Sequence, residues 1–350
     1  MCNSMPTTVP ELMRAYRLVA PNQLRWEQVP IPEPRVGEAL LRVIACGVCG
    51  TDLHLKTQGH YYWRQQPLTL GHEIVAEVVS LPLDAPNEWQ VGDVVVVDPQ
   101  LVCGACYFCR RGRLNLCDRL EHLGLSVDGG FAEYLTAPLR NLYRVPNHAA
   151  DADLTRYALV EPVATCVAGM RLANPQPDET VAIVGLGFFG QVYAQLARLW
   201  GVRSLLGLER DPARRAVAEQ LSAIVALEPE AWADNPIAAD VVIDAAGSPD
   251  AADWCLRLAR KAGRVIVFGY RPEPVQVDWY QILIKELTVL GSRSSNHAWE
   301  FALHLVHAQR LQLEPLVQRY SADAIQQAFA DAEAKQIFKP IVQLSGAHTG

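Results

Sequence analysis

The chain has no long apolar run and no basic leader, and from these two absences we expect neither a secreted nor a membrane-spanning protein. No apolar run reaches the ~18 residues needed to cross a bilayer, so the sequence predicts no membrane helix. The segment from Met1 to Glu11 is polar and lacks the basic-then-apolar order of a signal peptide. We therefore expect a cytoplasmic protein with no membrane partner.

Positive charge is also scarce relative to negative charge. The chain carries 31 Lys and Arg against 38 Asp and Glu, a formal net charge of -7. This balance gives no reason to expect a nucleic-acid partner or an anionic membrane surface. Internal repeats and low-complexity linkers are absent as well.

The remaining composition is that of an ordinary globular protein. At ~150 residues per domain, 350 residues indicate about two domains. Half of the residues are hydrophobic and a fifth are charged, so a core forms without disulfides. Nine cysteines are present, and four of them lie in one short stretch, which in a reducing compartment favours a metal over disulfides.

Strand and helix patterns divide the chain into three zones. From 15 to 146, short strands alternate with proline and glycine, which predicts a barrel-like, mostly β domain. From 161 to 291, strands alternate with helices, which predicts a parallel sheet covered on both faces. The clearest strands are 40–45, 74–80, 94–97, 181–184, 204–208, 241–244 and 264–268. The clearest helices are 191–200, 212–221, 251–260, 299–308 and 322–334, before a closing strand at 339–344.

A glycine pattern, Gly185-Leu-Gly187-Phe188-Phe189-Gly190, stands between a predicted strand and a predicted helix. The first glycine permits a tight turn, the second lets the backbone approach a pyrophosphate, and the third lets helix and strand pack closely. The N-terminus of the helix then offers N–H groups to the phosphates. These residues predict a dinucleotide site, although such glycines alone also serve purely structural turns.

An acidic residue supports the dinucleotide interpretation. Glu209 ends the second strand of this zone about 20 residues later, where a carboxylate binds ribose hydroxyls. It favours NAD, because it would repel the 2′-phosphate of NADP. Arg210 beside it is able to accept that phosphate, so NADP stays open as an alternative.

Four thiols lie within fifteen residues: Cys103, Cys106, Cys109 and Cys117. Two-residue gaps let consecutive sulfurs turn toward one ion, and four thiolates close a tetrahedral zinc site, so the predicted role is structural. The alternatives are unmetallated thiols, an iron–sulfur cluster or a nucleic-acid-binding zinc module. The dense run among glycines is a poor core segment, and the acidic chain argues against the last.

A second constellation comes from the stretches 47–54 and 71–73. A catalytic zinc keeps about three protein ligands and one open position. Cys49 and His72 offer two of them, and a carboxylate, either Glu73 or Glu161, offers the third. The residues alone leave this assembly open, because a lone cysteine or histidine is more often structural.

Together these motifs resemble the zinc-containing medium-chain dehydrogenase/reductase superfamily, in its polyol, sorbitol and threonine dehydrogenase branch. The resemblance covers nearly the whole chain and includes Asp128-Gly-Gly-Phe-Ala-Glu-Tyr134 and Glu161-Pro162. It implies an α/β protein with a GroES-like catalytic domain over residues 1–160, completed by 300–350. It also implies a Rossmann domain over residues 161–299 and a homodimer or homotetramer.

The resemblance further implies residue roles. Cys49 and His72 become zinc ligands, Thr51 hydrogen-bonds the substrate oxygen, and His54 relays its proton toward solvent. Thr165 falls where the family contacts the nicotinamide. We therefore expect two zinc ions, one catalytic and one structural, together with NAD.

The third zinc ligand distinguishes branches of the superfamily. Simple alcohol dehydrogenases have a cysteine where this chain has Glu161, and in the polyol branch either glutamate serves as ligand. We favour Glu73, with Glu161 orienting the water on the metal. Cys46 completes a Cys-x-x-Cys with Cys49, but we interpret it as a packing residue.

The predicted reaction is hydride transfer between NAD(P) and a secondary alcohol of a polyol, sugar or sugar derivative. An amino-bearing alcohol, threonine or an aminocyclitol, is the alternative substrate. A non-catalytic, zinc-stapled nucleotide-binding protein is the alternative of another class. Candidate walls of the substrate pocket are His60, Tyr61, Tyr62, Trp63, Phe131 and Arg293, although residues 60–63 would equally form a surface loop.

Overall fold

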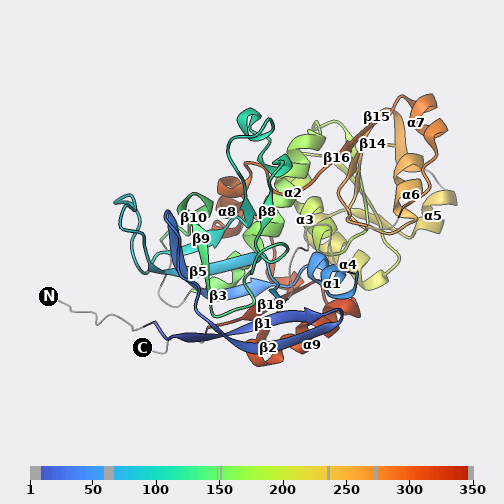
Figure 1. The fold of residues 1–350 in the computed structure, drawn as a ribbon. Coiled ribbons are helices and arrows are strands. Elements are labelled where there is room, and N and C mark those ends of the chain that lie inside the picture. Colours follow the sequence, from blue (N-terminus) through green and yellow to red (C-terminus); the bar gives the residue numbers. More distant parts are fainter. Residues whose placement is uncertain are drawn as a thin grey trace. The chain divides into compact units, whose positions relative to one another are not determined.

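The computed structural model describes residues 9–58, 67–147, 149, 152–234, 237–271 and 274–345. The chain forms two compact units, Met1–Leu159 with Gln318–Gly350, and Val160–Val317. Figure 1 shows the ribbon, with the β-rich first unit in blue to green and red. The sequence-based division placed a boundary at 300, whereas helix α8 (Trp299–His307) packs against α2 (Val160–Ala173) of the second unit.

The first unit is built mainly from antiparallel strands. One sheet has the order β10-β6-β5-β3-β18-β17, with β9 paired to β3, a second has the order β2-β1-β4, and β7 pairs with β8. Their bounds are β1 (Leu12–Ala20), β2 (Gln23–Pro30), β3 (Glu38–Gly47), β4 (Leu68–Thr69), β5 (Glu73–Ser80), β6 (Val94–Val97), β7 (Gln100–Leu101), β8 (Glu121–His122), β9 (Tyr134–Pro138), β10 (Leu142–Arg144), β17 (Val317–Ser321) and β18 (Lys339–Gln343). Helices α1 (Gly50–Gln58) and α9 (Ile325–Glu333) pack beside them.

The end of β3 is the point where three strands of this unit meet. Gly47, its last residue, pairs with Glu73 at the start of β5 on one side and with Ile341 of β18 on the other. Because these pairings are antiparallel, the loop after β3 lies beside the loop that precedes β5. The register therefore brings together segments that are far apart in the sequence.

The second unit is a parallel sheet of six strands in the order β13-β12-β11-β14-β15-β16. The strands are β11 (Thr180–Val184), β12 (Ser204–Leu208), β13 (Val225–Leu227), β14 (Ala239–Asp244), β15 (Ala259–Val267) and β16 (Thr288–Gly291). Every pairing is parallel. The strand order reverses between β11 and β14, and this reversal creates a crevice at the carboxyl ends of the strands.

Helices connect the strands of this sheet, and their bounds are α3 (Phe188–Leu199), α4 (Pro212–Ser222), α5 (Pro229–Asp234), α6 (Ala251–Leu258) and α7 (Trp279–Lys285). The strand order runs outward from β11 in both directions, and in such a parallel sheet the connecting helices cover both faces. The predicted α/β, doubly wound architecture is confirmed. Among the described residues, none of the helices combines the length and the apolar character that crossing a membrane requires.

Candidate active site

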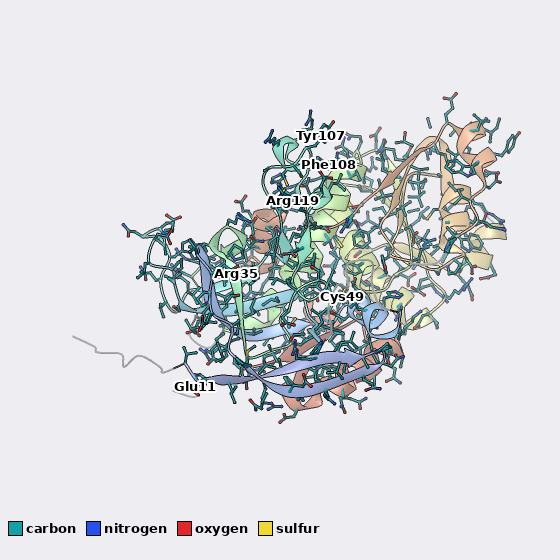
Figure 2. The ribbon with its side chains drawn as sticks, viewed as in Figure 1. Glu11, Arg35, Cys49, Tyr107, Phe108 and Arg119 are labelled. Atoms are coloured by element: carbon teal, nitrogen blue, oxygen red, sulfur yellow. The ribbon has the colours of Figure 1, made fainter. Side chains whose placement is uncertain are left out.

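Three predicted ligands lie together in the first unit. Cys49, His72 and Glu73 are all buried, and their ligand atoms lie within 4.8 Å of one another. Cys49 precedes α1, as labelled in Figure 2, while the other two residues stand at the start of β5. The pairing of β3 with β5 explains why residues more than twenty positions apart meet here.

Asp52, a residue to which the sequence assigned no role, ties the two ligand loops together. Its side chain is fully buried, and its Oδ2 accepts the N–H of Cys49 at 2.8 Å. Its Oδ1 accepts the N–H of Gly71 at 3.2 Å and lies 3.6 Å from Nδ1 of His72. This separation exceeds a hydrogen bond, and Nδ1 is buried without a hydrogen-bond partner among the described residues, so Asp52 acts on His72 through its charge and through the loop that it holds.

The electrostatic surroundings of His72 favour a positive charge. Burial alone would lower its pKa, but Asp52 and Cys49 outweigh burial and raise the pKa well above the usual value. An imidazole must be neutral to bind a metal, so a metal at this site displaces a proton. Metal affinity is therefore expected to fall as the pH falls.

Glu73 is held by a residue from the far end of the chain. Nζ of Lys339 donates to Oε1 of Glu73 at 2.6 Å and to the carbonyl of Val48 at 3.2 Å, and both side chains are buried. Oε2 of Glu73 is buried and has no hydrogen-bond partner among the described residues. A Cβ on Gly47 would lie 2.0 Å from that oxygen, so glycine leaves the room that the carboxylate needs.

The charges of this cluster fit a divalent cation. If Cys49 is a thiolate and the carboxylates of Asp52 and Glu73 are ionised, three negative charges face the single positive charge of Lys339. A zinc ion would cancel the remainder with His72 neutral, and uncompensated buried charge is costly. The unpartnered oxygen of Glu73 and the mixed sulfur, nitrogen and oxygen donors also suit zinc.

Thr51 and His54 both lie on α1, next to the cluster. Oγ1 of Thr51 is 3.7 Å from Sγ of Cys49. Residues three apart on a helix share one face, so His54 follows Thr51 along the same side of α1. Both residues are half-buried, and they therefore connect the interior with the surface.

Two further residues pack against the ligands. Sγ of Cys46 is fully buried, and burial, together with Asp52 and Glu73, raises its pKa well above the usual value, as expected for a neutral packing thiol. His122 lies edge-on to His72, with ring centroids 5.6 Å apart, and its Nδ1 is 2.9 Å from the carbonyl of Leu123. The sequence did not identify His122, because it lies outside every motif of known spacing.

The four-cysteine loop forms a second cluster in the same unit. Sγ of Cys103 is 3.5 Å from Sγ of Cys117 and 4.0 Å from Sγ of Cys109. Tetrahedral thiolates at ~2.3 Å from zinc are about 3.8 Å apart. The four sulfurs, with that of Cys106, lie within 4.8 Å of one another, and the eight described cysteines are free of disulfides.

Backbone groups already stabilise thiolates in this loop, which Figure 2 marks by Tyr107, Phe108 and Arg119. A hydrogen bond from the backbone of Ala105, with further donors, lowers the pKa of Cys103 to about 6. Burial and the neighbouring sulfurs raise the pKa of Cys109 to about 12. Without a cation, Cys103 and Cys109 therefore do not ionise over the same pH range, and a bound metal would remove this conflict.

The glycine loop of the second unit follows β11. Gly185 has φ +88°, and a Cβ there would lie 2.7 Å from Ala246. A Cβ on Gly190 would lie 2.0 Å from the carbonyl oxygen of Gly185, so helix and strand approach closely only with glycine. At Gly187 a Cβ would lie 3.7 Å from Nη1 of Arg214, an ordinary contact distance, which leaves this position open to a ligand.

The first turn of α3 offers its N–H groups to a ligand. Gly187 is the N-cap residue and supplies no side-chain cap, which leaves first-turn donors for phosphate oxygens. The rings of Phe188 and Phe189 pack edge-on at 5.7 Å, and Phe189 packs on Phe268 at 5.0 Å. Phe188 and Phe189 therefore offer their backbone N–H groups to a ligand, while their rings pack against other aromatic side chains.

Glu209 links the glycine loop to the segment that follows β12. Its Oε2 accepts the N–H of Leu186 at 2.9 Å, and its Oε1 accepts the N–H of Asp211 at 3.0 Å. Arg210 is exposed and directed toward Asp250. The acidic residue thus stands at the carboxyl end of the second strand, as the sequence predicted.

Glu161 and Thr165 lie on α2 and are both buried. Oγ1 of Thr165 donates to the carbonyl of Pro162 at 2.8 Å. Among the candidate pocket walls, Phe131 has no exposed surface and packs on Phe329. It is therefore a core residue and does not line a pocket, as the sequence had suggested it would. Arg293 is exposed, and residues 60–63 lie outside the described part of the chain.

Comparisons with known proteins cover both units. Residues 35–147 match the alcohol dehydrogenase GroES-like domain family, and residues 189–308 match the zinc-binding dehydrogenase family. The chain is 31% identical to an L-threonine 3-dehydrogenase from Pyrococcus abyssi, over 91% of this chain and 94% of that protein. It is 30% identical to a sorbitol dehydrogenase from Bacillus subtilis, over 76% and 77%.

A solved structure shares the fold over almost the whole chain. It is described as a zinc-binding dehydrogenase from Sinorhizobium meliloti bound to NADP. Its sequence is 32% identical, it covers 96% of this chain and 100% of its own, and the TM-score is 0.87. Both the fold and the sequence are thus similar to those of nicotinamide-linked dehydrogenases.

Proposed function

Since this chain belongs to the zinc-binding dehydrogenases of the alcohol dehydrogenase family, we propose that it transfers a hydride between NAD and a secondary alcohol of a polyol, sugar or sugar derivative. The reaction class follows from the family: the chain is an NAD(P)-dependent zinc alcohol dehydrogenase. The cofactor carries the redox chemistry, so the protein contributes position and electrostatics. The alternative of a non-catalytic nucleotide-binding protein is not retained.

The buried cluster of Cys49, His72 and Glu73 is the observation that supports the proposed active site. These three residues would hold the catalytic zinc. Glu161 does not belong to this cluster, which supports the predicted choice of Glu73 over Glu161 as the third ligand. When bound, zinc supplies a Lewis acid that lowers the pKa of an alcohol. The proposed role of Lys339 is to hold Glu73, and that of Asp52 is to hold the two loops that carry Cys49 and His72.

The proton of the substrate hydroxyl is proposed to leave through α1. Thr51 would hydrogen-bond the substrate oxygen and pass the proton to His54, because an imidazole both accepts and donates a proton. The half-buried position of both side chains supports such a path from the interior to solvent. The four cysteines 103, 106, 109 and 117 would hold the structural zinc.

The dinucleotide is proposed to lie across the carboxyl ends of β11, β12 and β14. Gly185, Gly187 and Gly190 would receive the pyrophosphate, Glu209 would accept the ribose hydroxyls, and Thr165 would contact the nicotinamide. The carboxylate of Glu209 supports NAD over NADP, because it would repel a 2′-phosphate.

Two substrate classes follow from the relatives. Similarity to a sorbitol dehydrogenase supports a polyol or sugar alcohol. Similarity to an L-threonine 3-dehydrogenase, over more of the chain, supports an amino-bearing secondary alcohol as the second candidate. Both classes present a secondary hydroxyl to the same proposed chemistry.

A substrate panel separates these candidates. NAD and NADP reduction would be measured against polyols, sugar acids, inosamines and threonine, with zinc quantified on the same sample. We expect turnover with a polyol or sugar derivative, a preference for NAD and about two zinc ions per chain. Turnover with threonine alone would replace the polyol proposal, and a tenfold preference for NADP would contradict the role of Glu209.

The second unit carries an apolar surface that supports a homo-oligomer. None of the residues of α7 is buried: Trp279 and Leu283 are each 74% exposed, and Tyr280 and Ile284 are also exposed. The adjacent strand β16 is the last strand of the parallel sheet in its described order and exposes Val289. Exposed apolar residues next to an open strand edge are typical of a protein interface. We propose that two copies associate through this face.

Replacing Leu283 with aspartate is expected to dissociate the oligomer. A charge buried at the centre of an apolar interface is costly, and the exposed position in a single chain lets the variant fold. Light scattering coupled to gel filtration would report a halved mass. The matched control is Leu172→Asp, an exposed leucine on α2, which should leave the mass unchanged. A wild-type monomer would contradict the proposal.

A further inference from the structure

An ion pair links the two segments that border the dinucleotide crevice. Strands β12 and β14 lie on either side of β11, so the segments that follow them flank the glycine loop. Arg210 follows β12, and Asp250 follows β14. Nη2 of Arg210 donates to Oδ2 of Asp250 at 2.8 Å, although 40 residues separate them.

The carboxylate of Asp250 is directed to the arginine instead of to its own helix. Asp250 is the N-cap residue of α6, where an aspartate ordinarily accepts an N–H of the first helical turn. Its side chain makes no such cap hydrogen bond. The residue therefore holds Arg210 without a side-chain cap on α6, and its charge is removable without loss of a capping hydrogen bond.

The backbone beneath Arg210 is fixed, so only its side chain is free to change partner. Nη1 of Arg215 donates to the carbonyls of Glu209 and Arg210 at 2.7 and 2.8 Å. Glu209 in turn accepts two backbone N–H groups. The hydrogen bond to Asp250 raises the pKa of Arg210, and the guanidinium is 63% exposed. It is thus a cation whose hydrogen bond a competing anion would have to take from Asp250.

We propose that Asp250 is a cofactor-specificity residue, which withholds Arg210 from the 2′-phosphate of NADP and so reinforces the exclusion by Glu209. NADP differs from NAD by a phosphate that carries nearly two negative charges, and an arginine beside the ribose is its usual partner. With Arg210 paired, that phosphate meets the carboxylate of Glu209 and a neutralised guanidinium. This inference rests on the proposed NAD-linked function.

The same surface supplies a matched control. A pocket of about 500 Å³ is lined by Arg210, Asp250, Asp253 and Arg257, among others. Asp253 pairs with Arg257 at 2.8 Å, one turn along α6. Asp253→Asn therefore removes the same charge from the same pocket and leaves the pair of Arg210 and Asp250 intact.

The test compares two fragments of the cofactors, 5′-AMP and 2′,5′-ADP, whose dissociation constants would be measured by calorimetry on the zinc-loaded protein. Asp250→Asn should bind 2′,5′-ADP about fivefold more tightly, which corresponds to ~1 kcal/mol, the upper range of an exposed ion pair. Its affinity for 5′-AMP should stay within about twofold. Asp253→Asn should leave both affinities unchanged, and Asp250→Asn with Arg210→Gln should lose the gain.

Three outcomes would overturn this inference and leave the proposed dinucleotide function intact. They are an unchanged affinity of Asp250→Asn for 2′,5′-ADP, an equal gain in affinity in Asp253→Asn, and a gain in affinity that persists when Arg210 is replaced. The second would reveal a general charge effect, and the third would show that Arg210 does not receive the phosphate. Failure of the wild-type protein to bind 5′-AMP would instead overturn the proposed dinucleotide function, and this inference with it.

Discussion

Replacing Cys49 with serine is expected to abolish alcohol oxidation, with kcat falling about a thousandfold or more. A serine hydroxyl has nearly the shape of the thiol but does not replace a thiolate as a zinc ligand. The Lewis acid contributes several kcal/mol to the reaction, and each 1.36 kcal/mol is tenfold in rate. Initial rates and zinc content would be measured together, and we expect one of two zinc ions to be lost.

The control for this variant lies three residues earlier. Cys46→Ala removes the other thiol of the Cys-x-x-Cys, which is buried and held neutral by its surroundings. We expect this variant to retain both zinc ions and most of its turnover, at a modest cost in stability. Zinc loss in Cys46→Ala, or more than a tenth of wild-type turnover in Cys49→Ser, would contradict the proposed ligand set.

The affinity of Cys49→Ser for NAD shows whether this variant has lost only its metal or has also misfolded. The glycine loop and Glu209 belong to the second unit, whereas Cys49 belongs to the first. Cys49→Ser should therefore bind NAD with nearly wild-type affinity. A parallel loss of NAD binding would mean that the variant is misfolded, and the loss of kcat would then say nothing about zinc.

The strands of both units were predictable because each contains a short run of consecutive apolar residues. The run of four valines in β6 and the apolar segments of β11 and β14 are buried, as sequence patterns of this kind indicate. Glycines at 185 and 190 identified the turn between β11 and α3. Such local signals survive because each depends on neighbouring residues only.

The helices α1 and α2 were not predicted, for opposite reasons. In α1 the sequence Gly-Thr-Asp-Leu-His-Leu-Lys-Thr-Gln has no apolar stripe, because the helix carries functional polar residues. In α2 most residues are buried, so no polar face remains to reveal a period of 3.6 residues. Both helices hold proposed site residues, and tertiary surroundings override the local pattern there.

The candidate ligands were predictable, but the residues that hold them were not. Cys49, His72 and Glu73 belong to short motifs, and the structure brings them together. Lys339 lies 266 residues from Glu73, and only the pairing of β18 with β3 makes them neighbours. A lysine at the first position of a closing strand carries no local signal, since lysines are usually exposed.

Replacing Cys106 with serine is expected to lower Tm by about 10 °C while leaving most of the turnover at low temperature. A four-thiolate site with one ligand missing loses its metal or binds it weakly, and the loop then keeps buried thiols without a cation. A loss of roughly 3 kcal/mol is typical for a lost structural metal or buried network. In a domain of about 200 residues each kcal/mol shifts Tm by ~2–4 °C.

A substitution in the same loop that spares the cysteines provides the control. Tyr107 is 60% exposed and stacks with Arg111, so Tyr107→Ala changes only the surface of the loop. Its Tm should shift by less than ~2 °C, because exposed substitutions cost little. Equal losses in both variants would point to a loop that is sensitive to any change, and an unchanged Tm in Cys106→Ser would contradict a structural zinc. Opposite effects of Cys49→Ser and Cys106→Ser, on turnover and on stability, are what two separate zinc sites require.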